Sequence, residues 1–371
     1  MKKVLFVSHT ANFSKFNRPF MRWFHEQGFE VHYASAGEER VLDCDKHFTI
    51  PFERSPFSIR NLKAIYSLRK IIQAENYLLV HCHTPVGSVV ARLAARTERE
   101  KGTKIVYTAH GFHFFRGAPK INWLLFYPIE KFLSKYTDCI VTINQEDYEL
   151  ASSKFHSKLV KKINGVGVDL SRFTPVDEQT KRTFRRERNY NNDDFILICV
   201  AEFTKNKNQQ LIIQAAEKLV CKIPSLKIVF AGCGEYLQEC RALVMSLGLE
   251  NFVEFVGYRK DIEKWYNIAD VGISASLREG LPINIVEEMA SGLPVICARI
   301  RGQIDVVTDQ RNGYLYDTDN VDQFCAAVLK LYENRNSLLN IGKACREDAQ
   351  LYSVADAIES MADIYTQVLE K

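Results

Sequence analysis

The segment from residue 276 to residue 295 holds the residues whose types and spacing could do the most chemistry. It places two carboxylates, Glu279 and Glu287, eight positions apart across a turn and the start of a predicted helix. Gly280 permits backbone angles that other residues avoid, and Pro282 suits the first helical position, where a missing N–H costs nothing. Carboxylates accept hydrogen bonds from hydroxyl groups, and the free N–H groups of a helix N-terminus bind anions. The segment therefore predicts a site for a ligand that carries both hydroxyls and phosphate, as a nucleotide sugar does.

The end of this predicted helix is marked as clearly as its start. Gly292 and Pro294 stop the helix, and a strand follows from Val295. The spacing of the two acids alone is a weak signal, because short motifs recur by chance. The alternative interpretation is that Glu279 caps the helix and Glu287 belongs to a solvated face.

The composition is that of an ordinary globular protein of about two domains. The chain has 371 residues, of which 46% are hydrophobic and 25% are charged. Residues 1–170 hold 25 Lys and Arg against 16 Asp and Glu, a net charge of +9, whereas the remainder has a net charge of −5. A basic first half indicates an anionic partner such as nucleic acid, phospholipid headgroups or a diphosphate-linked substrate. The basic residues are dispersed and no recognition module is visible, so we do not expect nucleic-acid binding.

The ten cysteines form no C-x-x-C pair, and several fall in apolar runs. This pattern is typical of free buried thiols in a reducing compartment and argues against disulfides or zinc. No apolar stretch approaches the roughly 18 residues of a membrane span, and the apolar run at the N-terminus is too short for a secretory signal. We therefore expect a cytoplasmic protein.

Short apolar runs alternate with amphipathic stretches of helical length, which predicts an α/β architecture with two parallel sheets. Helices are expected at 18–27 and 61–74. The expected strands lie near residues 4–8, 31–35, 78–83, 104–109 and 139–143, and then near 195–201, 227–231, 253–256, 271–275, 295–298 and 313–316.

A segment with two glycines and a proline, residues 164–175, separates the two series of strands, and the polar stretch 177–194 follows it. We expect a domain boundary here. Open α/β sheets bind ligands beyond the carboxyl ends of their strands, so two such domains would face each other across a cleft. A final helix near 353–369 follows a complete second domain and is expected to cross back to the first.

Several motifs together resemble a known family, the retaining GT-B glycosyltransferases of the E-x7-E group (family 4-like), particularly those of capsule and exopolysaccharide synthesis. The resemblance covers nearly the whole chain, and each motif alone is weak. The matching segments are Val80–His83, Tyr107–Gly111, Ile163–Asp169, Ala231–Gly234, Phe255–Gly257, Ala269–Asp270 and the 276–295 segment.

The resemblance implies a fold, domain bounds and a reaction. The fold is GT-B, with two doubly wound Rossmann-like domains: an acceptor-binding domain at 1–170 and a donor-binding domain at 171–352, with a C-terminal helix at 353–371. The reaction is transfer of a sugar with retention of configuration from a nucleotide diphosphate sugar, expected to be UDP-linked, to a hydroxyl of a lipid-linked glycan.

The resemblance also implies roles for individual residues on the donor side. Glu279 would bind hydroxyls of the donor sugar and Glu287 those of the ribose. Lys207 falls on the family's diphosphate-binding lysine. Glu202 falls where the family has an arginine, a reversal of charge, and Lys205 is our candidate replacement. The remaining candidates line the same loop and helix start: Gly280, Leu281, Pro282, Ile283 and Asn284.

Two further groups complete the predicted site. Gly232 and Gly234 follow a strand and would let the backbone approach the nucleotide, although a tight turn without a ligand explains them nearly as well. His110 ends a strand and would contribute catalytically, since imidazole both accepts and donates hydrogen bonds at neutral pH. His83 and Phe112 are candidates for acceptor binding. The alternative for both histidines is that backbone groups satisfy them.

Aromatic residues mixed with Lys and Arg run from 112 to 128, which suits either peripheral contact with an anionic inner membrane or a core helix with an interdomain loop. Pro128 argues against one long regular helix. No clustered Asp-x-Asp or histidine set falls within the motifs of the predicted site, so we expect no metal. Two other functions remain open: a nucleotide-sugar epimerase of the same fold, and a non-catalytic nucleotide-sugar-binding subunit, which Glu202 favours.

Overall fold

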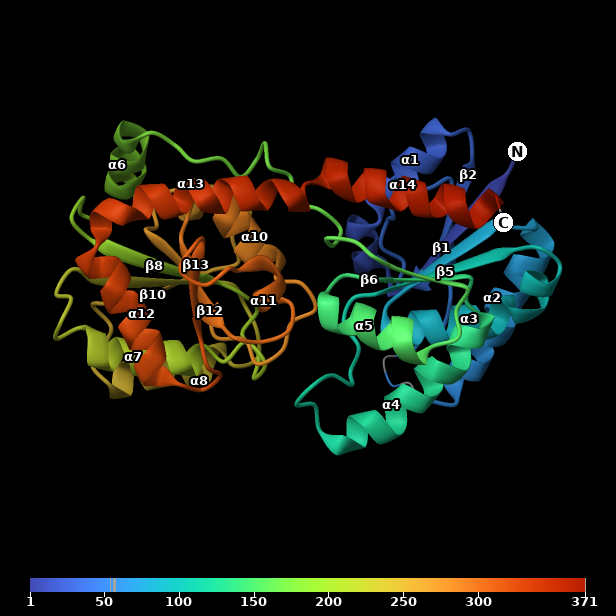
Figure 1. The fold of residues 1–371 in the computed structure, drawn as a ribbon, viewed down its shortest axis with the longest axis horizontal. Coiled ribbons are helices and arrows are strands. Elements are labelled where there is room, and N and C mark those ends of the chain that lie inside the picture. The colour runs from blue at the N-terminus through green and yellow to red at the C-terminus, as the bar shows by residue number, and fades with distance from the viewer. Residues whose placement is uncertain (54, 56–57, 371) are drawn as a thin grey trace. The chain divides into compact units, whose positions relative to one another are not determined.

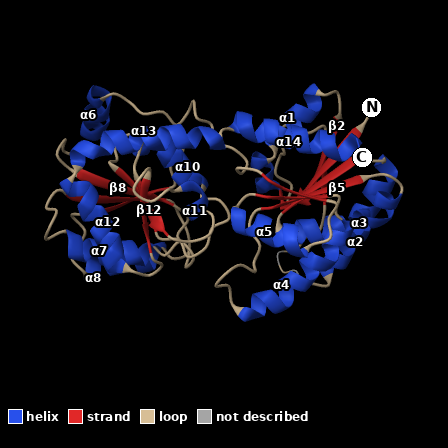
Figure 2. Cartoon of the chain, in the orientation of Figure 1, coloured by secondary structure: helices blue, strands red, loops and turns tan. Residues whose placement is uncertain are grey.

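The computed structural model describes residues 1–53, 55 and 58–370. They form two compact units, one of Met1–Gly167 with Val354–Lys371 and the other of Val168–Ser353 (Figure 1). Each unit has a parallel sheet between layers of helices, as Figure 2 shows.

The sheet of the first unit has the strand order β3-β2-β1-β4-β5-β6-β7, and every neighbouring pair is parallel. Its strands are β1 (Lys3–Thr10), β2 (Glu30–Ala36), β3 (Lys46–Thr49), β4 (Leu79–His83), β5 (Lys104–Ala109), β6 (Cys139–Thr142) and β7 (Leu159–Lys162). Its helices are η1 (Ala11–Phe16), α1 (Arg18–Glu26), α2 (Arg60–Glu75), α3 (Pro85–Glu100), α4 (Lys120–Leu133), η2 (Ser134–Tyr136), α5 (Gln145–Lys154) and α14 (Val354–Glu370).

The sheet of the second unit has the order β10-β9-β8-β11-β12-β13 and is also parallel. Its strands are β8 (Phe195–Val200), β9 (Leu226–Ala231), β10 (Val253–Gly257), β11 (Val271–Ser274), β12 (Val295–Ala298) and β13 (Gly313–Tyr316). Its helices are α6 (Glu178–Glu187), α7 (Gln209–Leu219), α8 (Leu237–Ser246), α9 (Ile262–Tyr266), α10 (Ile283–Ala290), α11 (Gln303–Val306), α12 (Val321–Glu333), η3 (Arg335–Ser337), α13 (Leu338–Ala349) and η4 (Gln350–Tyr352).

The central strands were predictable because both of their faces are buried, which makes them continuous apolar runs. In β8 the first five residues are all buried, and Phe195 and Leu197 belong to the core beneath α7 and α12. Two strands were missed, β3 and β7. Both are four-residue strands at an edge of the sheet, and both carry lysines, as edge strands commonly do.

The C-terminal helix packs within the first unit. α14 lies along α1 (Figure 1), and Tyr365 is fully buried against Phe24, with ring centroids 4.6 Å apart. Its phenol lies 2.7 Å from Nδ1 of His81 on β4, so a residue near the end of the chain contacts the centre of the first sheet.

The polar stretch 177–194 is ordered rather than a plain linker. Asp177 caps α6 by accepting a hydrogen bond from the Thr180 N–H at 2.7 Å. The guanidinium of Arg185, only 4% exposed, donates to the carbonyl of Ile268 and to the carboxylate of Asp270. The charged side chain of Arg185 therefore anchors α6 to the rest of the second unit.

The expectation that Pro128 breaks the helix is wrong, because α4 runs continuously through it. Proline removes the hydrogen bond to the carbonyl four residues earlier, that of Leu124. Leu124 lies on the exposed side of α4, being 70% exposed, and this is the side of a helix where water can replace a lost backbone hydrogen bond. Among the residues described, no helix is long and apolar enough to cross a membrane.

Candidate active site

The predicted donor residues of the second unit gather where its strand order reverses. β8 and β11 are neighbours in the sheet although 70 residues separate them, and the loops that follow them leave the sheet at the same edge. Open parallel sheets bind ligands at this edge, beside this reversal. The loop after β8 carries Lys207, and the loop after β11 carries Glu279.

These two residues form an ion pair. Nζ of Lys207 lies 2.5 Å from Oε1 of Glu279, and the two side chains are 22% and 13% exposed. The backbone joins the same loops, since the Leu277 N–H donates to the carbonyl of Asn206 at 2.8 Å and the Asn206 amide donates to the carbonyl of Arg278 at 2.9 Å. The cation and the carboxylate are thus held in fixed register.

The start of α10 differs in detail from the prediction. Pro282 precedes the helix at the N-cap position, with φ −82° and ψ 88°, and Ile283 is the first helical residue. No side chain caps the helix, so its first N–H groups stay available to an anion. The helix ends as predicted, with Gly292 in the left-handed region at φ +77° directly after the C-cap.

A left-handed glycine supports this loop from the neighbouring strand. Gly280 does not adopt a left-handed φ, whereas Gly302, in the loop after β12, has a φ of +80°. A Cβ atom at Gly302 would lie 2.5 Å from the carbonyl oxygen of Gly280. The neighbouring Arg301, which sequence reasoning missed, donates from Nε to the carbonyl of Glu279 at 3.2 Å. Residues 301 and 302 therefore support the Glu279 loop from the adjacent strand.

Glu287 lies on the partly exposed face of α10 together with Asn284. The buried phenol of Tyr266 donates to Oε2 of Glu287 at 2.9 Å, which orients the carboxylate. Burial, followed by the charge of Glu287, raises the pKa of Tyr266 well above its usual value, so this phenol remains a donor.

Glu288 follows Glu287 on α10, next to the predicted donor site, and the sequence analysis did not select it. It is fully buried, and neither of its carboxyl oxygens has a partner at hydrogen-bonding geometry, although the side chain of Asn284 and the charge of Lys207 both act to lower its pKa. The carboxyl group occupies the space above Gly272 of β11, where a Cβ would lie 2.2 Å from Oε2. Burial, with a smaller contribution from Glu287, raises the pKa of Glu288 well above its usual value.

Glu202 stands where the family has an arginine, and Lys205 is the candidate replacement; both lie on the surface. Glu202 and Lys205 are exposed, and in the part of the chain that the structure describes Lys205 forms no ion pair. Among the described residues, no ion pair links Lys205 to Glu279. Its role as the replacement cation stays a prediction.

Gly232 and Gly234 are required by packing between loops. A Cβ at Gly232 would lie 1.9 Å from the carbonyl oxygen of Ala201, and one at Gly234 would lie 2.3 Å from that of Phe203. Both have φ near +150°. These glycines let the loop after β9 press against the loop after β8, which carries Lys207, and their role toward the nucleotide stays a prediction.

In the first unit, the predicted histidines His83 and His110 lie together at the carboxyl ends of β4 and β5. Nδ1 of His83 is 3.2 Å from Nε2 of His110. His83 is 1% exposed, whereas His110 is partly exposed. His110 therefore faces outward, with His83 behind it.

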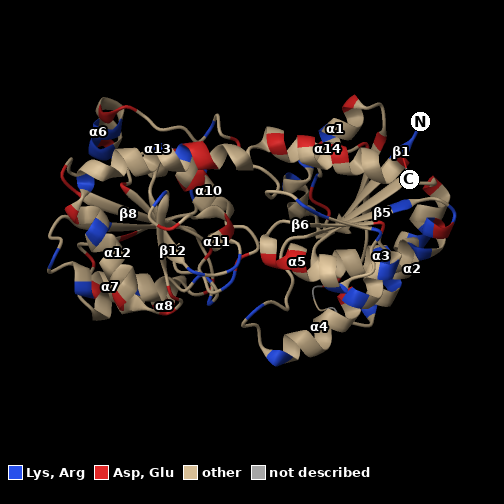
Figure 3. Ribbon diagram, in the orientation of Figure 1, with Lys and Arg blue, Asp and Glu red and all other residues tan. Residues whose placement is uncertain are grey.

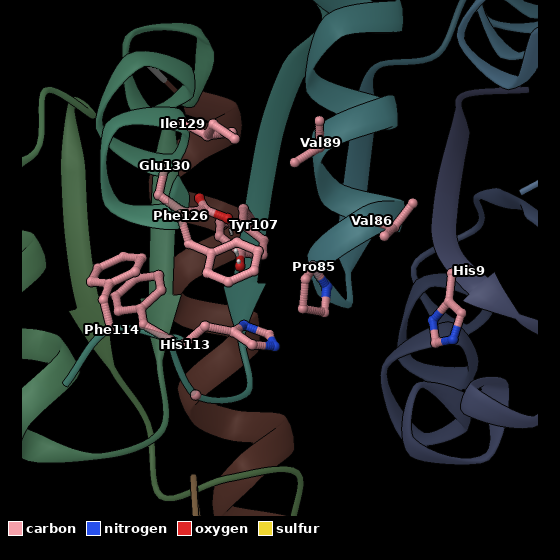
Figure 4. A pocket seen from close by; sticks show the side chains of 12 residues that line it. His9, Pro85, Val86, Val89, Tyr107, His113, Phe114, Phe126, Ile129 and Glu130 are labelled. Carbon is pink, nitrogen blue, oxygen red and sulfur yellow. Dashed lines mark hydrogen bonds between the residues drawn. The ribbon is translucent and has the colours of Figure 1, made fainter. Parts of the chain in front are cut away.

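Phe112 is 3% exposed and lines a pocket of about 240 Å³ in the first unit. Figure 4 shows the aromatic rings of Phe114 and Phe126 on one side of this pocket and Pro85 and Val86 of α3 on another. The lining is mainly apolar. Its acidic member, Glu130, forms an ion pair of 2.8 Å with the buried Arg92.

Among residues 1–53, 55 and 58–370, no group of three or more His, Cys, Asp or Glu side chains is arranged to hold a metal ion. The expectation of a metal-independent reaction stays a prediction.

Comparison with known proteins supplies the family. Residues 3–144 match the model described as glycosyl transferase 4-like, and residues 180–348 match that of glycosyl transferases group 1. The whole chain is 42% identical to the putative glycosyltransferase EpsD of Bacillus subtilis (strain 168), covering 97% of that protein.

A second relative is the UDP-Gal:alpha-D-GlcNAc-diphosphoundecaprenol alpha-1,3-galactosyltransferase of Escherichia coli, 26% identical over 84% of this chain and 81% of that protein. Among solved structures, Anabaena HepE in complex with UDP and glucose superposes with a TM-score of 0.83 at 17% identity, over 99% of this chain and 100% of that one. The fold is therefore GT-B, as predicted. The chain belongs to glycosyltransferase family 4, and it is a glycosyltransferase of this retaining family.

Proposed function

We propose that the protein transfers a sugar from a UDP-sugar to a hydroxyl of a lipid-linked glycan in exopolysaccharide assembly. The observation that carries the donor half is the Lys207–Glu279 pair beside the uncapped N-terminus of α10. The UDP bound to HepE and the UDP-galactose donor of the Escherichia coli relative support the choice of nucleotide.

The donor site follows from the chemistry of these groups. An ammonium group has three N–H donors, so Lys207 can keep Glu279 and still bind two phosphate oxygens. The first N–H groups of α10 bind the same diphosphate. The second oxygen of Glu279 accepts from a sugar hydroxyl, and Glu287, oriented by Tyr266, accepts from the ribose hydroxyls.

The enzyme's main task is to stabilise charge rather than to remove a proton. As the bond between sugar and diphosphate breaks, negative charge grows on the β-phosphate, and in this proposal Lys207 and the N-terminal N–H groups of α10 stabilise it. The acceptor hydroxyl attacks from the face that the diphosphate leaves, which retains the anomeric configuration. We propose that His110 hydrogen-bonds to a substrate oxygen.

An acceptor-dependent assay tests this function and separates it from the two alternatives. Purified protein is incubated with UDP-glucose, UDP-galactose or UDP-GlcNAc, with and without a polyprenyl-diphosphate-linked sugar. We expect UDP release only when an acceptor is present, and an axial product linkage by NMR if the donor is α-linked. Isomerised UDP-sugar without an acceptor would indicate an epimerase, and binding without turnover across the panel would indicate a non-catalytic subunit.

The outer face of α4 supports the lipid-linked acceptor. Four large apolar side chains at helical spacing are exposed there: Ile121 at 54%, Leu124 at 70%, Leu125 at 37% and Phe132 at 50%. Figure 3 shows a largely uncharged helix with Lys and Arg towards its N-terminal end, where Arg116 and Lys120 are exposed. An apolar face flanked by cations is typical of a helix that rests on anionic lipid.

We expect Leu124→Ser combined with Phe132→Ser to weaken binding to phosphatidylglycerol vesicles about tenfold, or about 1.4 kcal/mol, because two large side chains no longer enter the lipid. Cosedimentation measures this. Leu339→Ser is the matched control, since Leu339 is also 70% exposed but lies on α13 of the second unit. Equal binding by all three proteins would remove α4 from the acceptor model.

A further inference from the structure

The two histidines at the carboxyl edge of the first sheet share one hydrogen bond. Nδ1 of His83 and Nε2 of His110 are 3.2 Å apart. The other nitrogen of His83, Nε2, is buried and has no hydrogen-bond partner. His110 makes no other hydrogen bond with the described residues, so its Nδ1 is the nitrogen left for a substrate.

Aromatic rings fix both imidazoles in place. Phe13, from η1, packs edge-on against His110, with ring centroids 4.9 Å apart and an interplanar angle of 72°. The same ring lies 5.6 Å from His83, and Phe6 of β1 stacks on His83 at 6.3 Å and 6°. The η1 segment after β1 therefore supplies the ring that packs against His110.

Both histidines are neutral at physiological pH. Although the His110 ring is partly exposed, its desolvation by the surrounding protein lowers its pKa to about 4. Burial, with smaller contributions from His81 and His110, lowers the pKa of His83 well below its usual value. One hydrogen atom therefore lies between the two facing nitrogens, and either ring can carry it.

The two arrangements differ at the buried Nε2 of His83. If His110 donates, the proton of His83 must sit on Nε2 and becomes a buried N–H without an acceptor. If His83 donates from Nδ1, its Nε2 is a bare acceptor instead. Among backbone groups, orphaned buried N–H donors are rarer than acceptors that lack a partner, and we favour the second arrangement by the same reasoning.

We infer that His83 is a positioning residue that donates from Nδ1 to Nε2 of His110 and so makes Nδ1 of His110 an N–H donor toward the substrate. This inference rests on the proposed function. It specifies how His110 acts: the ring donates a hydrogen bond to a substrate oxygen and does not accept the proton of the attacking hydroxyl. Proton removal then falls to the departing diphosphate.

The tautomer of His110 can be measured without any substrate. Nitrogen-15 NMR of histidine-labelled protein distinguishes the two neutral forms, and His110→Asn identifies the His110 signals by their loss. We expect a single tautomer with the proton on Nδ1. A proton on Nε2 of His110 would overturn the inference, whether or not the protein proves to be a glycosyltransferase.

Two variants of similar size test the positioning role. The amide of His83→Asn branches from Cγ as Nδ1 does and can still donate to His110, whereas His83→Leu fills the space but cannot. We expect His83→Asn to keep kcat within about threefold, and His83→Leu to lower kcat about tenfold or more, with little change in donor KM and a mixed His110 tautomer.

Thermal unfolding checks that both variants fold. The inference fails if folded His83→Leu keeps both its kcat and the single Nδ1–H tautomer. Wild-type protein that turns over no donor with any acceptor would instead refute the proposed function. The NMR result would still show which of the two histidines donates the hydrogen bond.

Discussion

Lys207→Ala is expected to reduce turnover about 100-fold, equivalent to about 2.7 kcal/mol of transition-state stabilisation. The substitution removes the cation at the β-phosphate and also leaves Glu279 unpaired beside the diphosphate, where two negative charges repel. We expect the effect in kcat at saturating UDP-sugar, because the charge it opposes grows mainly as the bond breaks.

Lys222→Ala provides the matched control. Lys222 is exposed and lies just before β9, at the amino edge of the same sheet. Its loss should change kcat less than twofold, since exposed charges far from a site are screened. Equal rates for Lys207→Ala and the wild type would remove Lys207 from the mechanism.

Glu288→Met is expected to stabilise the protein by about 3 kcal/mol at pH 8. The buried carboxyl group has two oxygens without partners, each costing about 1–3 kcal/mol. Methionine is unbranched and fills irregular space without polar atoms, so it can occupy the volume above Gly272. Urea unfolding measures the difference.

The same substitution predicts a change in pH dependence. The folded-state pKa of Glu288 is raised above its unfolded value, so the unfolded chain releases this proton first and the wild type loses stability as pH rises above about 4.5. The advantage of the variant should therefore be smaller at pH 5 than at pH 8.

Glu217→Met, at an exposed position of α7, should change stability by no more than about 0.5 kcal/mol. A Glu288→Met protein less stable than the wild type at pH 8 would mean that the carboxyl group has a stabilising partner in solution.

The sequence predicted the elements of the fold well where burial leaves a simple pattern. Strands such as β8 and β12 are buried on both faces, so their apolar runs stand out. The edge strands β3 and β7 and the charged helix α6 were missed, because their stability comes from one neighbouring strand or from ion pairs such as Arg185–Asp270. Such contacts leave no periodic signal.

The sequence predicted which residues belong to the candidate site, but it did not predict which of them are in contact. Lys207 and Glu279 were selected by motif, yet only the adjacency of β8 and β11 brings two residues 72 positions apart within 2.5 Å. The close fit of Glu288 over Gly272, the support that Gly302 gives the Glu279 loop and the His83–His110 bond all depend on strand order. A single sequence does not encode strand order in its periodicity.

The most direct test of the donor site is diffraction from crystals grown with UDP. We predict density for the diphosphate within about 3 Å of Nζ of Lys207, against the first N–H groups of α10, with the ribose hydroxyls on the carboxylate of Glu287. UDP bound elsewhere on the protein, with Lys207 still paired only to Glu279, would contradict the account.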